Sequence, residues 1–282
     1  MNTDQSRLFC DTALAERIER AEAELVAKAS EAARRRRADT AGFVITIAGG
    51  VATFVEADSP FNKVAGLGFG GMPNAADLNK VEQAFTACGA PVQVELARLA
   101  DPTVGALLTE RGYRLTSFEN VLGLALRAER NRANPTGIEV RPSGDDEFEP
   151  WLDVVVGAVA YADTQGVPSH EEFPREVVVG AMRDMAAAGV KRYVALRDGA
   201  IAGGGTFRVT GGVAQLTGAA TAPEHRRQGI QTALLSARLA EAAAAGCDLA
   251  VITTQPGSKS QQNAQRQGFD LLYTRAILVK QP

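Results

Sequence analysis

A short segment in the C-terminal half, residues 226–232 (Arg-Arg-Gln-Gly-Ile-Gln-Thr), has the residue types of an anion-binding loop. The apolar pattern of residues 213–217 predicts a strand before it, and the apolar spacing after it predicts a helix. N–H groups in the first turn of a helix have no intrahelical partners, and the helix dipole favours negative charge there. Gly229 permits close approach of the backbone to a phosphate, and Arg226 and Arg227 can add charge-assisted hydrogen bonds. The segment therefore predicts a phosphate or pyrophosphate site, with an ordinary basic helix start as the alternative.

The elements around this loop recur earlier in the chain. Residues 43–52 and 193–202 share an aromatic–valine start, a glycine turn and an apolar end, which is typical of a hairpin. Residues 111–115 and 267–271 share a glycine–aromatic pair that is followed closely by a leucine. Each half also carries a predicted helix that ends at a glycine and is followed by a predicted strand. The same order of elements in both halves predicts a tandem duplication, since two repeats are too few for a solenoid.

The boundary between the repeats is predicted by composition. Residues 131–137 are polar, contain Pro135 and Gly137, and follow an apolar strand pattern, so they are typical of a linker. We expect an N-terminal domain over residues 1–130 and a C-terminal domain over residues 138–282. Apolar residues at three- and four-residue spacing also predict a long helix in the first part of the N-terminal domain.

The C-terminal motifs resemble those of the GNAT acetyltransferase superfamily. That family has a splayed strand and then a loop of pattern Arg/Gln-x-x-Gly-x-Gly/Ala that opens a helix, and here the pattern is Arg226-x-x-Gly229-x-Gln231. The preceding Ala-Pro-Glu of residues 222–224 and the glycine–aromatic pair of residues 265–269 are also similar to the family. The resemblance implies two tandem GNAT-like domains of the α/β (α+β) class. Each would have a mixed, mostly antiparallel twisted sheet flanked by helices.

The resemblance also implies a co-substrate and a reaction. Acetyl-CoA would donate an acetyl group to an amine of a small molecule, or less often of a protein, by direct attack in a ternary complex. A backbone N–H at the bend after Gly218, from Ala220 or Thr221, would stabilise the oxyanion. The residues implied in acetyl-CoA binding are Ala219, Ala220, Thr221, Arg226, Arg227, Gln228, Gly229, Ile230, Gln231 and Thr232.

The sequence departs from the family in two places. Gln231 stands where a small residue is usual, and Ala264 stands where many members carry a tyrosine that acts as general acid. Ser260 and Asn263 are the polar residues beside that position, and either can contact the cofactor or cap the predicted helix.

The residues that move protons are less well defined. Tyr273, near the strand end that follows Gly268 and Phe269, is a candidate acid or a residue that lines the pocket, and packing in the core or at its rim is its alternative role. His170 has the intrinsic pKa of a general base, and a helix start before Glu171 and Glu172 is its alternative role. His170 also falls in the segment that the resemblance places over the acceptor site.

The corresponding segment of the first repeat, residues 62–73, is glycine-rich but has no arginine pair. A proline also separates it from the predicted helix of residues 78–85. We expect a packed turn there rather than a phosphate site. The N-terminal domain would then be a degenerate GNAT unit that shapes the substrate pocket or serves as a scaffold.

The composition excludes several classes of protein. The chain has a net charge of −3, two histidines and three widely spaced cysteines, so we expect no nucleic-acid partner, no metal and a cytoplasmic location. No apolar stretch has the length of a membrane span or signal peptide. The glycine segments lack the strand–helix context of a dinucleotide fold. The alternatives that remain are a non-catalytic acyl-CoA-binding regulatory module and an acyltransferase with another acyl-CoA donor. A monomer and a homodimer are both compatible with the sequence.

Overall fold

The computed structural model describes residues 7–38, 42–126, 137–160, 167 and 173–282. The N-terminal half contains α1 (Thr12–Arg37), β1 (Phe43–Ile47), β2 (Gly50–Phe54), β3 (Lys63–Ala65), α2 (Ala75–Ala87), β4 (Val92–Ala97), α3 (Thr103–Glu110) and β5 (Arg114–Ala125). The C-terminal half contains β6 (Ile138–Pro142), α4 (Phe148–Ala160), α5 (Arg175–Ala187), β7 (Lys191–Arg197), β8 (Ala200–Thr210), β9 (Val213–Thr221), α6 (Ile230–Ala244), β10 (Leu249–Thr254), α7 (Lys259–Arg266) and β11 (Asp270–Lys280). The order from β1 to β5 recurs from β7 to β11, as the repeat in the sequence predicts.

The strands of the described residues form one sheet of eleven strands, in the order β1-β2-β3-β4-β11-β5-β10-β9-β8-β7-β6. The β3–β4 and β9–β10 pairings are parallel, and the other pairings in this order are antiparallel. The predicted fold class, a mixed and mostly antiparallel sheet flanked by helices, is therefore confirmed. The two repeats share this sheet and do not form a sheet each.

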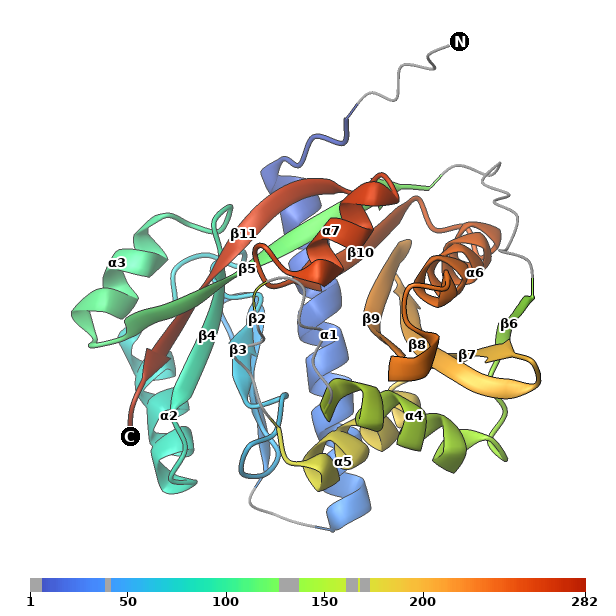
Figure 1. The fold of residues 1–282 in the computed structure, drawn as a ribbon. Helices are drawn as coiled ribbons and strands as arrows, with labels where there is room; N and C mark the ends of the chain where they lie inside the picture. The colour runs from blue at the N-terminus through green and yellow to red at the C-terminus, as the bar shows by residue number, and fades with distance from the viewer. Residues whose placement is uncertain (1–6, 39–41, 127–136, 161–166, 168–172) are drawn as a thin grey trace.

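The two repeats exchange their last strands at the centre of the sheet (Figure 1). β11 of the second repeat pairs with β4 of the first, and Leu278 lies opposite Val94. β5 of the first repeat pairs with β10 of the second, and Thr253 lies opposite Val121. β5 and β11 also pair with each other. Each half of the sheet is thus completed by a strand from the other repeat.

Helices cover both faces of the sheet. On one face, α1 lies between β2 and β9 with α5 beside it, as Figure 1 shows. Val213 and Val251 point to this face, where they pack with Ile18 of α1. Their neighbours Ala214 and Ala250 point to the opposite face and pack with α6. This alternation follows from the period of two in a strand, and it means that α1 and α6 lie on opposite sides of β9 and β10.

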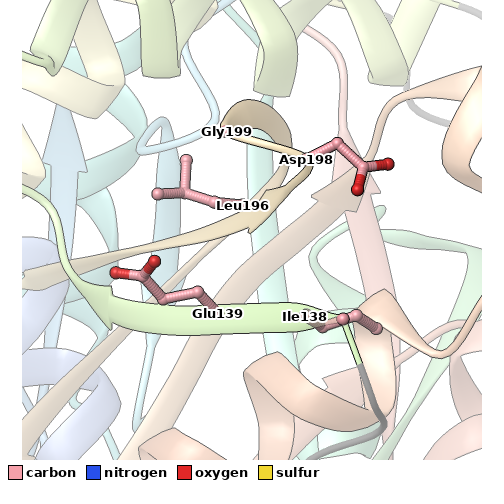
Figure 2. Close-up of a pocket in the computed structure, with 6 residues that line it drawn as sticks. Ile138, Glu139, Leu196, Asp198 and Gly199 are labelled. Atoms are coloured by element: carbon pink, nitrogen blue, oxygen red, sulfur yellow. The ribbon is translucent and has the colours of Figure 1, made fainter.

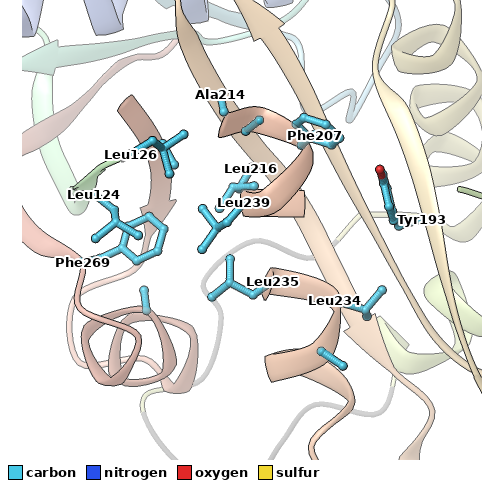
Figure 3. Packing of buried hydrophobic residues seen from close by; sticks show 14 of the residues in the cluster. Leu124, Leu126, Tyr193, Phe207, Ala214, Leu216, Leu234, Leu235, Leu239 and Phe269 are labelled. Carbon is cyan, nitrogen blue, oxygen red and sulfur yellow. The ribbon is translucent and has the colours of Figure 1, made fainter. Parts of the chain in front are cut away.

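The largest apolar cluster fills the space between α6, α7 and the sheet (Figure 3). Leu234, Leu235 and Leu239 of α6 recur at the spacing of one helix face, as the sequence predicts. They pack on Phe207 of β8 and Leu216 of β9. This packing fixes the first turn of α6 beside the end of β9.

β8 contains consecutive glycines because helices approach it closely on both faces. A Cβ on Gly204 would lie 2.3 Å from Trp151 Nε1 of α4, and one on Gly205 would lie 2.9 Å from Arg238 Cζ of α6. Trp151 Nε1 donates a hydrogen bond to Tyr193 O at 2.9 Å. α4 is therefore held on the same face of the sheet as α1, opposite α6.

A buried charged cluster surrounds Arg275 on the exchanged strand β11. Arg275 Nε donates to Glu19 Oε1 of α1 at 2.8 Å, and Arg275 Nη1 lies 3.4 Å from Glu95 Oε2 of β4 and 3.6 Å from Glu119 Oε2 of β5. Lys63 Nζ of β3 donates to Glu95 Oε1. Although burial lowers the pKa of Arg275, the neighbouring carboxylates outweigh it and raise that pKa well above its usual value. Every carboxylate in these contacts belongs to the N-terminal repeat.

Candidate functional site

β9 and β10 separate at the centre of the C-terminal half. Their parallel pairing ends where Gln215 lies opposite Val251. Beyond that point β9 stays paired with β8 as far as Thr221, and β10 stays paired with β5 as far as Thr254. Gln215 and Val251 are buried, whereas residues 218 and 219 of β9 and Thr253 of β10 are exposed. The two strands therefore bound an opening that widens toward solvent.

The backbone of β9 presents alternate N–H groups to this opening. The N–H of Ala222 donates to the carbonyl of Ala202 at 3.0 Å. Bonded and non-bonded pairs alternate along an antiparallel ladder, so the N–H of Ala220, opposite Gly204, also points to β8. The N–H groups of Ala219 and Thr221 then point to the opening. Of the two predicted oxyanion donors, Thr221 has the suitable direction and Ala220 does not.

Arg238 of α6 supports β9 from the face opposite α1. Its side chain is buried, and Nη1 donates to Gly218 O at 3.0 Å and to Thr206 O at 2.9 Å, while Nε donates to Leu234 O at 3.0 Å. Burial lowers the pKa of Arg238 to about 10, which leaves it charged at neutral pH. A buried cation held by carbonyl groups is costly and indicates a specific role. The pattern of α6 predicts only an apolar face, and this arginine was not identified from the sequence.

The start of α6 has the geometry of an anion site. Gly229, the N-cap residue, has φ +88° and provides no side-chain cap, and the first turn contains no acidic residue. Arg227 also has a positive φ of +63° and is exposed with Gln228 and Thr232, while Arg226 is half-buried. Ile230 is buried and anchors the turn. The first-turn N–H groups are therefore left without a side-chain cap, as an anion-binding helix start requires.

Gln231 connects the two predicted binding segments. Its Nε2 donates to Thr221 Oγ1 at 2.9 Å and so joins the first turn of α6 to the end of β9. Gln228 Nε2 donates to Glu224 O at 3.0 Å within the preceding loop. The structure thus brings Ala219, Ala220 and Thr221 beside residues 226–232.

The corresponding helix of the first repeat, α2, begins with a side-chain cap. The Asn74 side chain caps α2 by accepting from Asp77 N at 2.8 Å, and Asp77 places a carboxylate in the first turn. The glycine-rich segment before α2 packs on the β1–β2 turn, and a Cβ on Gly49 would lie 2.4 Å from Gly70 N. A capped, acidic helix start repels an anion. This geometry matches the packed turn expected for residues 62–73.

The other predicted contacts lie on or near α7. Ser258, not Ser260, caps this helix by accepting from Gln261 N at 3.2 Å. Ser260 is exposed and Asn263 is half-buried, so neither is occupied as a cap. Ala264, where the family often has a tyrosine, is buried in the apolar cluster.

The two residues considered for proton transfer have different outcomes. The Tyr273 hydroxyl donates to Glu19 Oε1 at 2.7 Å, and burial together with Glu19 raises its pKa well above 10. It lies on β11, separated from β10 by β5, within the charged cluster. His170 lies outside the described residues.

A depression of about 340 Å³ lies away from this opening, at the edge strand β6 (Figure 2). Glu139 and Asp198 provide its charged side chains, so it does not suit an anionic cofactor. Within the described ranges, no group of three or more His, Cys, Asp or Glu side chains is placed to hold a metal ion. No helix among the described residues has the length and apolar character needed to cross a membrane.

Comparisons with known proteins agree with this geometry. Residues 158–269 match the Acetyltransferase (GNAT) family. The C-terminal half contains a GNAT domain. No protein of curated function matches the chain.

Solved structures extend the likeness to the whole chain. A GCN5-related N-acetyltransferase from Kribbella flavida has 19% identity and a TM-score of 0.66, with coverage of 95% of this chain and 96% of that one. A tandem GNAT protein from the clavulanic acid biosynthesis pathway has 14% identity and a TM-score of 0.59, and 96% of each chain is covered. A putative GNAT acetyltransferase from Novosphingobium aromaticivorans has 15% identity and a TM-score of 0.52, with coverage of 92% and 99%. At these identities the structures show a shared fold, and that fold is a tandem GNAT fold.

Proposed function

We propose that this protein is an acetyltransferase that moves an acetyl group from acetyl-CoA to an amine of a small molecule. The observation that carries the proposal is the opening between β9 and β10 beside the uncapped, arginine-preceded start of α6. An open strand pair next to an anion site suits a ligand with a thioester at one end and a pyrophosphate at the other. Both features lie in the segment that matches the acetyltransferase family.

The residues present fit this co-substrate. Residues 226–232, with the N–H groups of the first turn of α6, would hold the pyrophosphate. Residues 219–221 would lie along the pantetheine arm, where the N–H groups that face the opening are unpaired with β8. The half-buried Asn263 and the exposed Ser260 would border the same region from α7.

The chemistry assigned to these groups is acyl transfer by direct attack. Acetyl-CoA supplies an activated thioester carbonyl, and the protein supplies position and charge stabilisation. The N–H of Thr221, with that of Ala219, would stabilise the negative charge that develops on the carbonyl oxygen. Arg238 would keep β9 in the conformation that presents those N–H groups, through its bond to Gly218 O.

A substitution at Thr232 tests the cofactor site. Thr232 is the third residue of α6, the position that Asp77 occupies in α2. Thr232→Asp should weaken acetyl-CoA binding at least about 10-fold in calorimetric titration, because a carboxylate there opposes the pyrophosphate. The same change favours the helix dipole by about 0.3–1 kcal/mol, so Tm should not fall.

Thr232→Asn is the matched control and should bind acetyl-CoA nearly as well as the unmodified protein. A single site per chain is expected because α2 is capped and acidic. Two equivalent sites, or no binding by the unmodified protein, would contradict the proposal.

A second candidate function is a non-catalytic acyl-CoA-binding regulatory module, and the observation that favours it is Ala264. This residue is buried, and it stands where many family members carry a tyrosine that acts as general acid. Release of CoA thiol in the presence of a small amine, measured with a thiol reagent, separates the two functions. Binding without amine-dependent thiol release would favour the regulatory module, and transfer to other acyl-CoA donors would identify an acyltransferase of different specificity.

A further inference from the structure

The face of the opening that points to α1 is bordered by carboxylates from the N-terminal repeat. Gln215 is the last residue of β9 that pairs with β10, and its Nε2 donates to Glu22 Oε2 of α1 at 3.2 Å. Gln215 Oε1 accepts from Arg208 Nη1 at 3.3 Å. Because Arg208 can only donate, it fixes the orientation of the Gln215 amide, so the NH₂ group points to Glu22. Glu22 is therefore held at the closed end of the opening, on the side away from α6.

Glu22 belongs to a wider acidic surface on the same face. Glu22 and Glu119 both lie close enough to Lys63 to raise its pKa, together with Glu95 and against the effect of burial. Glu22 also raises the pKa of Arg275. The Glu119 side chain is 24% exposed, whereas Glu19, Glu95 and Arg275 are buried. Glu22, which is half-buried, and Glu119 are thus the carboxylates of this cluster that solvent reaches most readily.

The cluster carries more negative than positive charge. Among the residues that the structure describes, it contains four carboxylates and two cations, while Arg208 is paired separately with Glu24. The charged groups within electrostatic reach of Glu22 are Glu19, Lys63 and Arg275, and Arg208 approaches it through Gln215. Burial, with Glu22, raises the pKa of Glu19, and even a neutral Glu19 leaves an excess carboxylate. Such a surface attracts a cation.

We propose that the N-terminal repeat supplies the acceptor side of the site, where Glu22 binds and deprotonates the reacting ammonium group of a small diamine or polyamine and Glu119 binds a second ammonium group. This inference rests on the proposed acetyl transfer. The two faces of the opening would separate the two substrates, with acetyl-CoA toward α6 and the amine toward α1. The exchange of β5 is what places Glu119 beside β10.

The reaction balances without another reactant. An ammonium group, R–NH₃⁺, gives one proton to the Glu22 carboxylate, directly or through one water, and becomes a nucleophile. Its nitrogen forms a bond to the thioester carbon, and the carbon–sulfur bond breaks. A second nitrogen proton passes to the departing CoA thiolate. The products are the acetylated amine, CoA thiol and the proton on Glu22, which water removes.

The test compares putrescine with benzylamine as acceptors for the full chain with acetyl-CoA. The unmodified protein should show kcat/KM for putrescine at least about 10-fold above that for benzylamine, since only putrescine can use both carboxylates. Glu22→Gln should lower kcat/KM for both amines about 100-fold at pH 7, with Tm and the Kd for acetyl-CoA unchanged. This deficit should shrink as the pH rises toward the amine pKa of about 10, where the amine no longer needs a base.

Two further variants separate catalysis from folding. Glu119→Gln should lower kcat/KM for putrescine more than kcat/KM for benzylamine and so remove the preference for putrescine. Glu31→Gln, an exposed residue on the same helix, should change nothing. Three outcomes would overturn the inference while acetyl transfer stands. They are full activity of Glu22→Gln, a loss of kcat/KM in Glu22→Gln that is equal at every pH, and no preference for putrescine by the unmodified protein. If the unmodified protein binds acetyl-CoA but acetylates neither amine, the assigned acceptor class is wrong. If it does not bind acetyl-CoA, the proposed function fails as well.

Discussion

The Arg238 guanidinium donates a hydrogen bond to Gly218 O at 3.0 Å, three residues before Thr221, whose N–H faces the opening. Arg238→Met removes this bond and retains an apolar side chain of similar length. We expect kcat to fall about 10- to 100-fold, because a misplaced oxyanion donor costs on this scale. Tm should change little, because replacement of a buried charged group by an apolar side chain of similar size is often neutral for stability. Steady-state kinetics and a thermal melt test both statements, and Glu241→Gln on the same helix is the control. Unchanged kcat would show that β9 keeps its conformation without Arg238.

The strand exchange predicts that the halves depend on each other. Residues 1–126 alone would lack the strand that lies between β4 and β5, and residues 137–282 alone would lack the one between β10 and β11. We expect each fragment to be insoluble or largely unfolded when expressed alone, and the two to form a soluble 1:1 complex when expressed together. Size-exclusion chromatography and circular dichroism check this. A stable, monomeric fragment 137–282 would show that its last strand can return to its own repeat.

Glu82 of α2 should make a pH-dependent contribution to the free energy of unfolding. Its carboxylate accepts hydrogen bonds from Arg111 Nε at 2.9 Å and from Lys280 Nζ of β11 at 2.8 Å. Burial opposes ionisation of Glu82, but these two cations outweigh it and lower its pKa below 4.5. A carboxyl group whose pKa is lower in the folded state stabilises the fold at pH values above its unfolded-state pKa. This stabilisation is lost as the pH falls through its folded-state pKa. Glu82→Gln should therefore cost about 1–2 kcal/mol at pH 7.

The cost of the same variant should fall as the pH drops below the unfolded-state pKa of Glu82, and it should vanish once the pH is below the lowered folded-state pKa. Urea unfolding at pH 7 and at a series of lower pH values measures the change. Glu31→Gln, an exposed change on α1, serves as the control and should give equal values at each pH. A cost for Glu82→Gln that does not vary with pH would indicate packing rather than charge.

Gly204→Ala tests how tightly α4 is held against the sheet. The new Cβ would lie 2.3 Å from Trp151 Nε1, which already donates to Tyr193 O. We expect a loss of about 1–3 kcal/mol in the free energy of unfolding, as in other overpacked cores. Gly199→Ala is not a suitable control, because Gly199 has φ +79°. Gly157→Ala in α4 is suitable, since no atom lies within 4 Å of its added Cβ. Equal stability of the two variants would contradict the predicted contact.

Local sequence patterns predicted much of this structure. The repeated order of elements, the loop–helix motif at Gly229 and the packed turn before α2 each depend on residues close together in the chain. Such features are set by backbone preferences and short-range hydrogen bonds, which a single sequence records. The positions of residues 219–221 beside residues 226–232 also follow, because a strand that leads directly into a loop and helix must lie next to them.

The features that sequence reasoning missed depend on distant contacts. Nothing near Glu22 indicates that it faces Gln215, since one is in the first helix and the other in the ninth strand. Arg238 occurs on an apolar helix face, and only its carbonyl partners on β8 and β9 explain it. The burial of Tyr273 agrees with core packing, one of the roles weighed for it, but its partner could not be predicted. The exchange of β11 places it against Glu19 of the first repeat.

The position of β11 also constrains how the protein is made. It is synthesised after the other strands of this sheet, yet it lies between β4 and β5 of the first repeat. Domains often fold from the N-terminus while translation continues. Here the first repeat cannot complete its sheet until β11 has been made. Until then the edges of β4 and β5 that β11 will cover are exposed to other chains.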